Sequence, residues 1–260
     1  MDLRWQDGGR AAATATTARR SDCVCPPWST CTRPENTIES FRLALRLGAT
    51  GLESDVWITA DGEPVLDHDG AFGPRLRRRQ IADLRTSQLP SHMPTLAEFY
   101  DSVTTSVPFS LDVKDPAAFD AVVAVARNAG AEHQLWLCHP TLEQLLPWRH
   151  ATEARLVDST RLSRIAEGIE RRAHRLRDTG IDAINLRHMD WSGGAIAMFH
   201  RFERYALGWD AQHPREIANL LDAGIDGVFS DHSDRLAAQW AAFYPDHAES
   251  SDAHQPNEPE

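Results

Sequence analysis

The sequence predicts a single α/β domain built as a (β/α)₈ barrel, with its first strand absent or irregular. Short apolar runs of strand length alternate with helical patterns along residues 34–245, which is typical of βαβ units and a parallel sheet. Three predicted helices end at a glycine that is followed at once by a new strand, in residues 127–137, 177–186 and 221–230. The length of 260 residues suits one such domain.

The predicted strands are short runs rich in β-branched, aromatic and other apolar side chains. They lie at residues 51–59, 63–69, 107–114, 134–139, 154–158, 182–186, 205–209 and 226–230. The predicted helices carry apolar side chains three or four positions apart. They lie at residues 35–49, 117–130, 141–148, 164–180, 193–204 and 214–224. Asn36 and Thr37 can cap the first helix, and Gly48 can end it.

Both ends of the chain depart from this pattern. Residues 1–33 are rich in Ala, Thr and Arg without a sustained hydrophobic period, so we expect a disordered or out-of-frame segment. Residues 34–245 form the predicted barrel domain. They supply seven strand–helix units, and the missing first strand is expected just before Pro34. Residues 246–260 predict a disordered acidic tail.

Composition argues against several classes of function. The net charge of −11 disfavours a nucleic-acid partner, because binding phosphates needs a basic face. No apolar run approaches the ~18 residues of a membrane span, so no stable membrane insertion is expected. Cys23, Cys25 and Cys31 lie in the atypical N-terminal segment without metal-binding spacing, which disfavours a zinc site or a disulfide framework. We expect a cytoplasmic protein; the sequence does not predict its oligomeric state.

Charged side chains gather at the ends of predicted strands. Glu53 and Asp55 are two residues apart, as are Asp112 and Lys114, so each pair lies on one face of its strand. His68 follows another short strand. The carboxyl ends of barrel strands open onto one mouth, where three carboxylates repel one another unless a cation joins them. Carboxylate oxygens suit Mg²⁺ or Ca²⁺, and a nearby lysine and histidine suit a phosphate ester.

Lys114 is the only lysine in the chain, against 26 arginines. In a chain so biased toward arginine, a retained lysine indicates a place where a compact point charge is needed. The alternative is that one lysine codon survived by chance. Its position two residues after an inward-facing carboxylate favours a functional role.

Residues 34–69 resemble the opening of the glycerophosphodiester phosphodiesterase family. That family's pattern runs His-Arg-Gly, Pro-Glu-Asn-Thr, a helix, Glu-x-Asp-Val, Thr-x-Asp-Gly and His-Asp. Residues 93–101, 111–115 and 206–236 resemble later family segments in the same order. The resemblance covers about residues 34 to 240. It implies a metal-dependent phosphoric diester hydrolase that converts small-molecule glycerophosphodiesters to glycerol 3-phosphate and an alcohol.

By matched position, the resemblance assigns roles to individual residues. Glu53, Asp55 and Asp112 would bind one divalent cation, Mg²⁺ or Ca²⁺. His68 would be one of two acid/base histidines, and Lys114 would hold the phosphate. Three further positions would contact the substrate or support the site, with Trp209 forming a wall at the glycerol end: Glu35, Asn36 and Trp209.

The chain departs from the family pattern where the His-Arg-Gly element should stand. That element supplies the second acid/base histidine and a phosphate-binding arginine, so we expect impaired activity; losing one acid/base group costs ~10²–10⁴ in rate. Shifting the reading frame of residues 23–28 by one nucleotide is compatible with Ala-Phe-Ala-His-Arg-Gly. We therefore hypothesise that residues up to about 30 are translated out of frame. In addition, residues 208–214 (GWDAQHP) replace a more usual Trp-Thr-Val-Asn, which bears on the leaving-group preference.

Two alternative functions remain open. One is a pseudoenzyme that binds metal or a phosphodiester. The other is a phospholipase of the sphingomyelinase D type on the same barrel. The latter is expected to carry disulfides and apolar membrane-facing loops. His188 and His232 are candidates to replace the missing histidine, and the sequence gives no geometry to decide this; His139 is interpreted as an ordinary residue at the end of a barrel strand.

Overall fold

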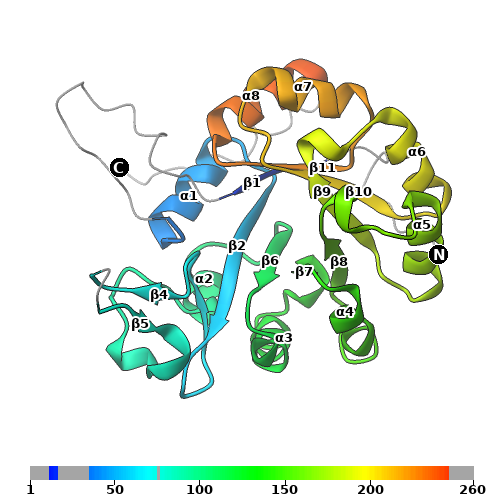
Figure 1. The fold of residues 1–260 in the computed structure, drawn as a ribbon. Coiled ribbons are helices and arrows are strands. Elements are labelled where there is room, and N and C mark those ends of the chain that lie inside the picture. The colour runs from blue at the N-terminus through cyan, green and yellow to red at the C-terminus, as the bar shows by residue number, and fades with distance from the viewer. Residues whose placement is uncertain (1–11, 17–34, 75–76, 246–260) are drawn as a thin grey trace.

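The computed structural model describes residues 35–74 and 77–245, together with the backbone of residues 12–16. Within these residues, parallel strands form a barrel (Figure 1). In ring order they are β1 (Ala12–Thr16), β2 (Gly51–Ile58), β6 (Phe109–Val113), β7 (Leu135–His139), β8 (Arg155–Ser159), β9 (Ala183–Arg187), β10 (Tyr205–Trp209) and β11 (Gly227–Ser230). β1 pairs in parallel with both β11 and β2, and so joins the two ends of the sheet.

Helices lie around the outside of the barrel (Figure 1). The α-helices are α1 (Ile38–Arg46), α2 (Leu96–Ser102), α3 (Phe119–Asn128), α4 (Leu142–Trp148), α5 (Ile169–Asp178), α6 (Gly193–Arg201), α7 (Pro214–Asp222) and α8 (Ser233–Phe243). Short 3₁₀ helices occupy the connections: η1 (Ile81–Asp83), η2 (Thr86–Gln88), η3 (Pro116–Ala118), η4 (Glu132–Gln134), η5 (Leu162–Arg164) and η6 (His188–Asp190). Thr37 caps α1 by accepting a hydrogen bond from the backbone N–H of Ser40, as residues of this type do at helix starts.

Three small strands extend the loop that follows β2. β3 (Pro64–Leu66) pairs antiparallel with the end of β2, and β4 (Ala71–Phe72) pairs with β5 (Arg79–Gln80). The turn between β3 and β4 needs a glycine at position 70. Gly70 has a φ of +66°, and a Cβ there would lie 2.4 Å from the ring of Trp57. This turn carries His68.

The hydrophobic core has two layers. Between the helices and the sheet, Phe41, Phe99 and Phe109 pack ring against ring, with centroids 4.0–5.8 Å apart. A second cluster comes entirely from barrel strands and fills the interior of the ring: Trp136, Cys138, Val157, Ala183, Leu207 and Phe229. The barrel is therefore a packed core, and polar side chains at the strand ends can lie only at its mouth.

The predicted barrel is confirmed, and its first position is occupied by β1. This strand lies within the segment 1–33, earlier than the place just before Pro34 where the first strand was expected. Its five residues pair with Gly51–Glu53 of β2 and with Gly227–Ser230 of β11. The proposed frame shift at residues 23–28 and the acidic tail at 246–260 fall outside the described residues.

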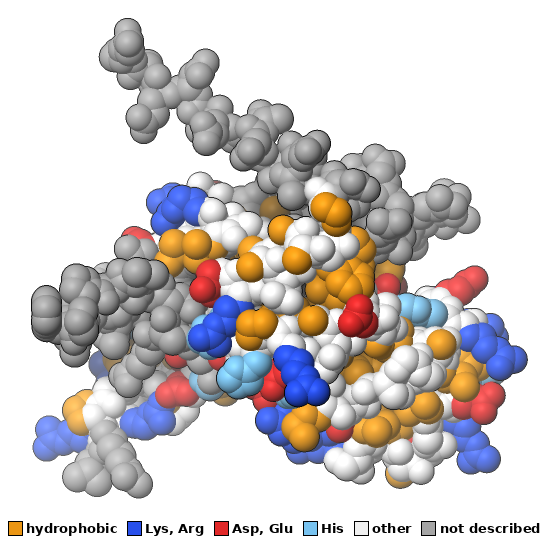
Figure 2. All heavy atoms as spheres, turned by 90° about the horizontal axis from the view of Figure 1, so that it is seen from above, with side chains coloured by type: hydrophobic (Ala, Val, Ile, Leu, Met, Phe, Trp, Pro, Cys, Tyr) orange, Lys and Arg blue, Asp and Glu red, His pale blue; other side chains and the backbone are white. Residues whose placement is uncertain are grey.

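Figure 2 shows the molecule from above, and on this face acidic, basic and hydrophobic side chains are interspersed. No helix in the described ranges is long and apolar enough to cross a bilayer.

Candidate active site

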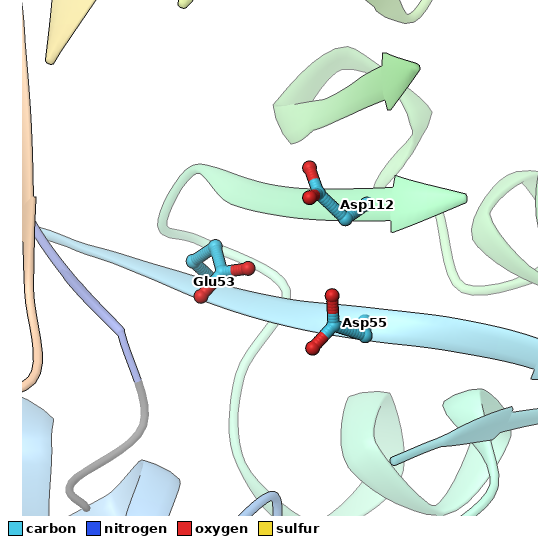
Figure 3. Close-up of side chains that lie close together, drawn as sticks. All are labelled: Glu53, Asp55 and Asp112. Atoms are coloured by element: carbon cyan, nitrogen blue, oxygen red, sulfur yellow. The ribbon is translucent and has the colours of Figure 1, made fainter. Parts of the chain in front are cut away.

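Three carboxylates meet at the mouth of the barrel. Glu53 and Asp55 project from the same face of β2, and Asp55 stands opposite Asp112 in the register of β2 with β6. Each of the three offers an oxygen within 4.8 Å of the others (Figure 3). The two-residue spacing and the parallel pairing thus bring the predicted residues together, and we call this group the carboxylate triad.

The electrostatics of the triad are unfavourable without a cation. Burial, followed by the charges of Asp55 and Asp112, holds the pKa of Glu53 well above its ordinary value. Burial also raises the pKa of Asp55 to about 6, although the neighbouring Lys114 acts in the opposite direction. Three hard oxygen donors in this environment fit a divalent cation such as Mg²⁺ or Ca²⁺. The donor set is therefore suited to the metal that the sequence predicts.

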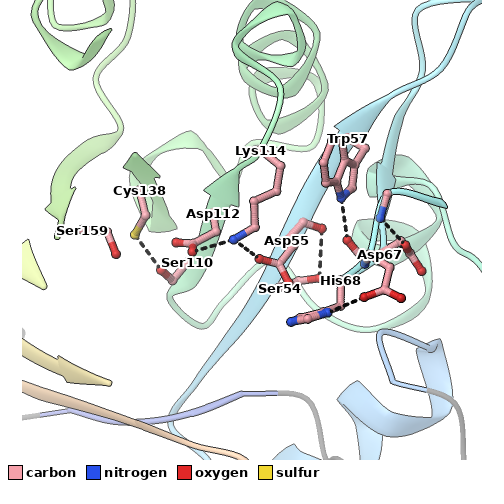
Figure 4. Close-up of polar contacts among 12 residues, drawn as sticks. Ser54, Asp55, Trp57, Asp67, His68, Ser110, Asp112, Lys114, Cys138 and Ser159 are labelled. Atoms are coloured by element: carbon pink, nitrogen blue, oxygen red, sulfur yellow. Dashed lines mark hydrogen bonds and ion pairs between the residues drawn. The ribbon is translucent and has the colours of Figure 1, made fainter. Parts of the chain in front are cut away.

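Lys114 bridges two members of the triad. Its ammonium nitrogen lies 2.7 Å from an oxygen of Asp55 and 3.1 Å from an oxygen of Asp112 (Figure 4). Burial opposes the charged form of Lys114, but the two carboxylates outweigh it and raise its pKa above the ordinary value. The lysine therefore remains a cation at the mouth, with 35% of its side chain exposed to solvent.

His68 is held in place by a short chain of polar contacts. Its Nδ1 lies 2.9 Å from an oxygen of Asp69, whose other oxygen lies 2.6 Å from the guanidinium of Arg78. Arg78 also donates to the backbone carbonyl of Ala71. In Figure 4 His68 lies on the Asp55 side of the lysine, whereas Cys138 lies on the far side of Asp112. The contacts of Asp69 and Arg78 fix the imidazole ring; sequence patterns did not identify this pair, because it depends on the path of a loop.

The triad lines one wall of a cavity of about 470 Å³. Lys114, His68 and Trp209 line it as well. The cavity extends across the mouth to the ends of other strands, where its polar lining includes Ser159, Thr160, Arg161, Arg164, Asn185, Asp210, Gln212 and Asp231. A small polar substrate with an anionic centre fits this combination of size and charge.

Comparison with known proteins identifies the family. Residues 29–160, just over half of the chain, match the Glycerophosphoryl diester phosphodiesterase family. The chain belongs to this family. It is accordingly a phosphoric diester hydrolase of the class that hydrolyses glycerophosphodiesters, as the resemblance of its motifs implied.

Relatives within this family match most of the chain. Probable glycerophosphodiester phosphodiesterase 2 of Mycobacterium tuberculosis is 25% identical over 229 residues, covering 78% of this chain and 84% of the relative. A glycerophosphodiester phosphodiesterase structure from Thermotoga maritima has a TM-score of 0.70 at 20% identity, covering 86% of this chain and 96% of that one. A phosphodiesterase from Oleispira antarctica, solved with the product sn-glycerol-3-phosphate, has a TM-score of 0.73 at 17% identity, covering 89% and 97%. These two likenesses establish the shared fold.

The remaining predicted residues lie in different places. Asn36 is buried and accepts a hydrogen bond from Ser54 at 2.9 Å. It therefore contacts β2 on the face opposite to Glu53 and Asp55. Glu35 is half-buried, and neither it nor Asn36 lines the cavity. Trp209 does line it, at the end of β10.

His139, interpreted from the sequence as an ordinary residue, lies in a different place from His188 and His232, the two candidates to replace the missing histidine. His139 lines the cavity at the end of β7, whereas His188 and His232 are not part of its lining. Burial lowers the pKa of His139, and its Nδ1 lies 3.1 Å from the backbone nitrogen of Thr141. The strand-end position was visible in the sequence, but only the fold shows which strand ends share this cavity.

Proposed function

We propose that this chain hydrolyses glycerophosphodiesters to glycerol 3-phosphate and an alcohol with one divalent cation, Mg²⁺ or Ca²⁺, held by Glu53, Asp55 and Asp112. One observation carries the proposal: three mutually repelling carboxylates lie within 4.8 Å of one another, beside the sole lysine, in a member of this family. The product bound to the Oleispira antarctica phosphodiesterase supports the choice of substrate class.

The residues of the proposed site have separate roles in the reaction. Bound at the triad, a divalent cation supplies Lewis-acid polarisation of a phosphoryl oxygen. Lys114 presents a positive charge to the phosphate. His68 transfers a proton, while Asp69 holds its Nδ1 and thereby sets which ring nitrogen faces the substrate.

The chain as written lacks two groups that the family pattern supplies. The His-Arg-Gly element is absent from the sequence, and we expect the rate to be lower by ~10²–10⁴ for the missing acid/base histidine alone. This departure is the one observation that favours a second candidate, a pseudoenzyme that binds metal or a phosphodiester without turnover. Nothing among the described residues favours the sphingomyelinase D alternative. The cytoplasmic location stays a prediction.

The test is the release of glycerol phosphate from glycerophosphoglycerol and glycerophosphocholine with Mg²⁺ or Ca²⁺. This chain is assayed beside a version with residues 23–28 rebuilt as Ala-Phe-Ala-His-Arg-Gly. Release by the rebuilt chain alone supports the proposed site and the frame-shift hypothesis together. Release by both chains at similar rates supports the proposed activity but contradicts the role given to the missing histidine, and makes His139 the first replacement to examine. Release by neither contradicts the proposed activity.

A further inference from the structure

Two arginines on the cavity wall have no carboxylate partner in the part of the chain that the structure describes. Arg161 and Arg164 both line the cavity, and within the described ranges neither lies within 4.0 Å of an Asp or Glu oxygen. Other arginines of the same region are paired, such as Arg172 with Asp158 and Arg187 with Asp210. Uncompensated positive charge at a cavity attracts negative charge, so these two residues point to an anionic ligand group.

Local structure directs both side chains to one place. Arg161 immediately precedes the 3₁₀ helix η5 and Arg164 ends it; the backbone carbonyl of Arg161 accepts a hydrogen bond from the backbone N–H of Arg164 at 2.9 Å, and both residues line the cavity. The guanidinium of Arg161 lies over the ring of Trp209, 5.2 Å from its centroid. This cation–π contact holds the arginine at the mouth and leaves that face of the indole less open to a cationic ligand group.

This part of the cavity is separate from the carboxylate triad. In ring order, β8 and β10 each lie three strands away from β2, on opposite routes around the barrel. Arg161 follows β8 and Trp209 ends β10, whereas Glu53 and Asp55 belong to β2. A diester whose phosphate lies at the triad therefore reaches Arg161 only with one of its two ends.

The nearby acidic groups are already engaged. Asp210 lies 2.7 Å from a guanidinium nitrogen of Arg187, and Asp190 accepts a hydrogen bond from the backbone N–H of Leu162. Asp231 also lines the cavity, and it accepts a hydrogen bond from the side chain of Gln212 at 3.0 Å. The triad differs, because Lys114 contacts two of its three carboxylates and the donor set suits a divalent cation. With a cation at the triad, both sides suit anionic parts of one substrate: the diester phosphate at the triad and a second anionic group at Arg161 and Arg164.

We propose that Arg161, Arg164 and Trp209 form a subsite for a second anionic group, so that the chain prefers glycerophosphodiesters whose alcohol carries its own phosphate or carboxylate. This inference rests on the proposed function and adds the substrate class. It assigns the Trp209 side of the cavity to the charged alcohol, whereas the family resemblance assigned Trp209 to the glycerol end.

The experiment uses two substrates that differ by one phosphate: glycerophosphoglycerol and its derivative phosphorylated on the terminal hydroxyl of the alcohol. Values of kcat/KM are measured with Mg²⁺ for the full chain and for Arg161→Gln, Arg164→Gln and Arg161→Lys. Arg171→Gln is the matched control, because Arg171 is an exposed arginine of α5 outside the cavity. Calorimetric binding of the same two diesters in EDTA provides a readout that does not require turnover.

We expect the full chain to prefer the phosphorylated diester. Each glutamine variant should lower kcat/KM for that diester about five- to tenfold and leave the unphosphorylated one within about twofold. Arg161→Lys should retain part of the preference, and Arg171→Gln all of it. Equal losses on both diesters, or no preference in the full chain, would overturn the inference.

The EDTA measurements separate this inference from the proposed function. If neither diester is hydrolysed, the proposed activity fails, and binding alone decides the subsite. Tighter binding of the phosphorylated diester that disappears in Arg161→Gln supports the subsite. Equal binding of the two diesters overturns it.

Discussion

Replacing Lys114 by methionine tests whether the triad is built for a cation. The lysine lies 2.7 Å from Asp55 and 3.1 Å from Asp112. At an effective dielectric constant of about 20, two unit charges ~3 Å apart attract each other by about 5 kcal/mol. Solvent screens part of this attraction because 35% of the side chain is exposed. When the lysine is removed, the carboxylates can also take up a proton, which reduces the loss of stability further. We therefore expect Lys114→Met to lower the free energy of unfolding by about 2 kcal/mol in EDTA at pH 8.

A divalent cation should remove most of this loss. A metal ion at the triad neutralises the same carboxylates, so with Mg²⁺ or Ca²⁺ in excess the difference between Lys114→Met and the unaltered chain should fall below about 1 kcal/mol. Urea unfolding with EDTA and with each cation measures both differences, and Lys114→Arg, which keeps the charge, serves as the control. An equal loss with and without the cation would refute the reasoning and leave Lys114 as an ordinary structural ion pair.

Three further predictions concern groups around the site. Asp69→Asn should lower kcat about tenfold with KM nearly unchanged, because the contact that orients His68 is weakened; a change in KM alone would argue against it. His139→Asn should leave kcat of the rebuilt chain within about twofold; a loss of 10²-fold in steady-state assays would give His139 a catalytic role. Burial raises the pKa of Asp158 to about 6, despite the opposing charge of Arg172. The free energy of unfolding is thus greatest below pH 4, where Asp158 is protonated in both states, and it falls by about 3 kcal/mol as the pH rises from about 4 to above 6. Urea unfolding of Asp158→Asn, measured across this pH range, should lack that fall.

The sequence predicted the centre of the site because simple geometry governs it. Residues two apart on a strand share a face, and parallel strands bring their carboxyl ends together, so Glu53, Asp55, Asp112 and Lys114 were expected to converge. They do. Their roles as metal and phosphate ligands stay predictions.

The sequence could not predict the residues whose positions depend on loops. Arg161 lines the cavity and Arg78 contacts Asp69 beside His68; both lie in connections whose course follows from packing, and nothing in their neighbours' periodicity marks them. The first strand was expected just before Pro34, whereas β1 lies earlier in the chain. Residues 12–16 are Ala and Thr alone and give no hydrophobic signal, yet their backbone pairs with both β2 and β11.

The most direct test of the central claim compares glycerol phosphate release with Asp112→Asn and with Asp112 intact. Both forms are made in this chain and in the rebuilt chain, and each is assayed with Mg²⁺ and with EDTA. Asparagine keeps the size of Asp112 and removes one anionic ligand of the triad. We predict release that requires the cation and falls at least 10²-fold in Asp112→Asn. Release that is unaffected by EDTA and by the substitution would contradict a metal-dependent site at the triad.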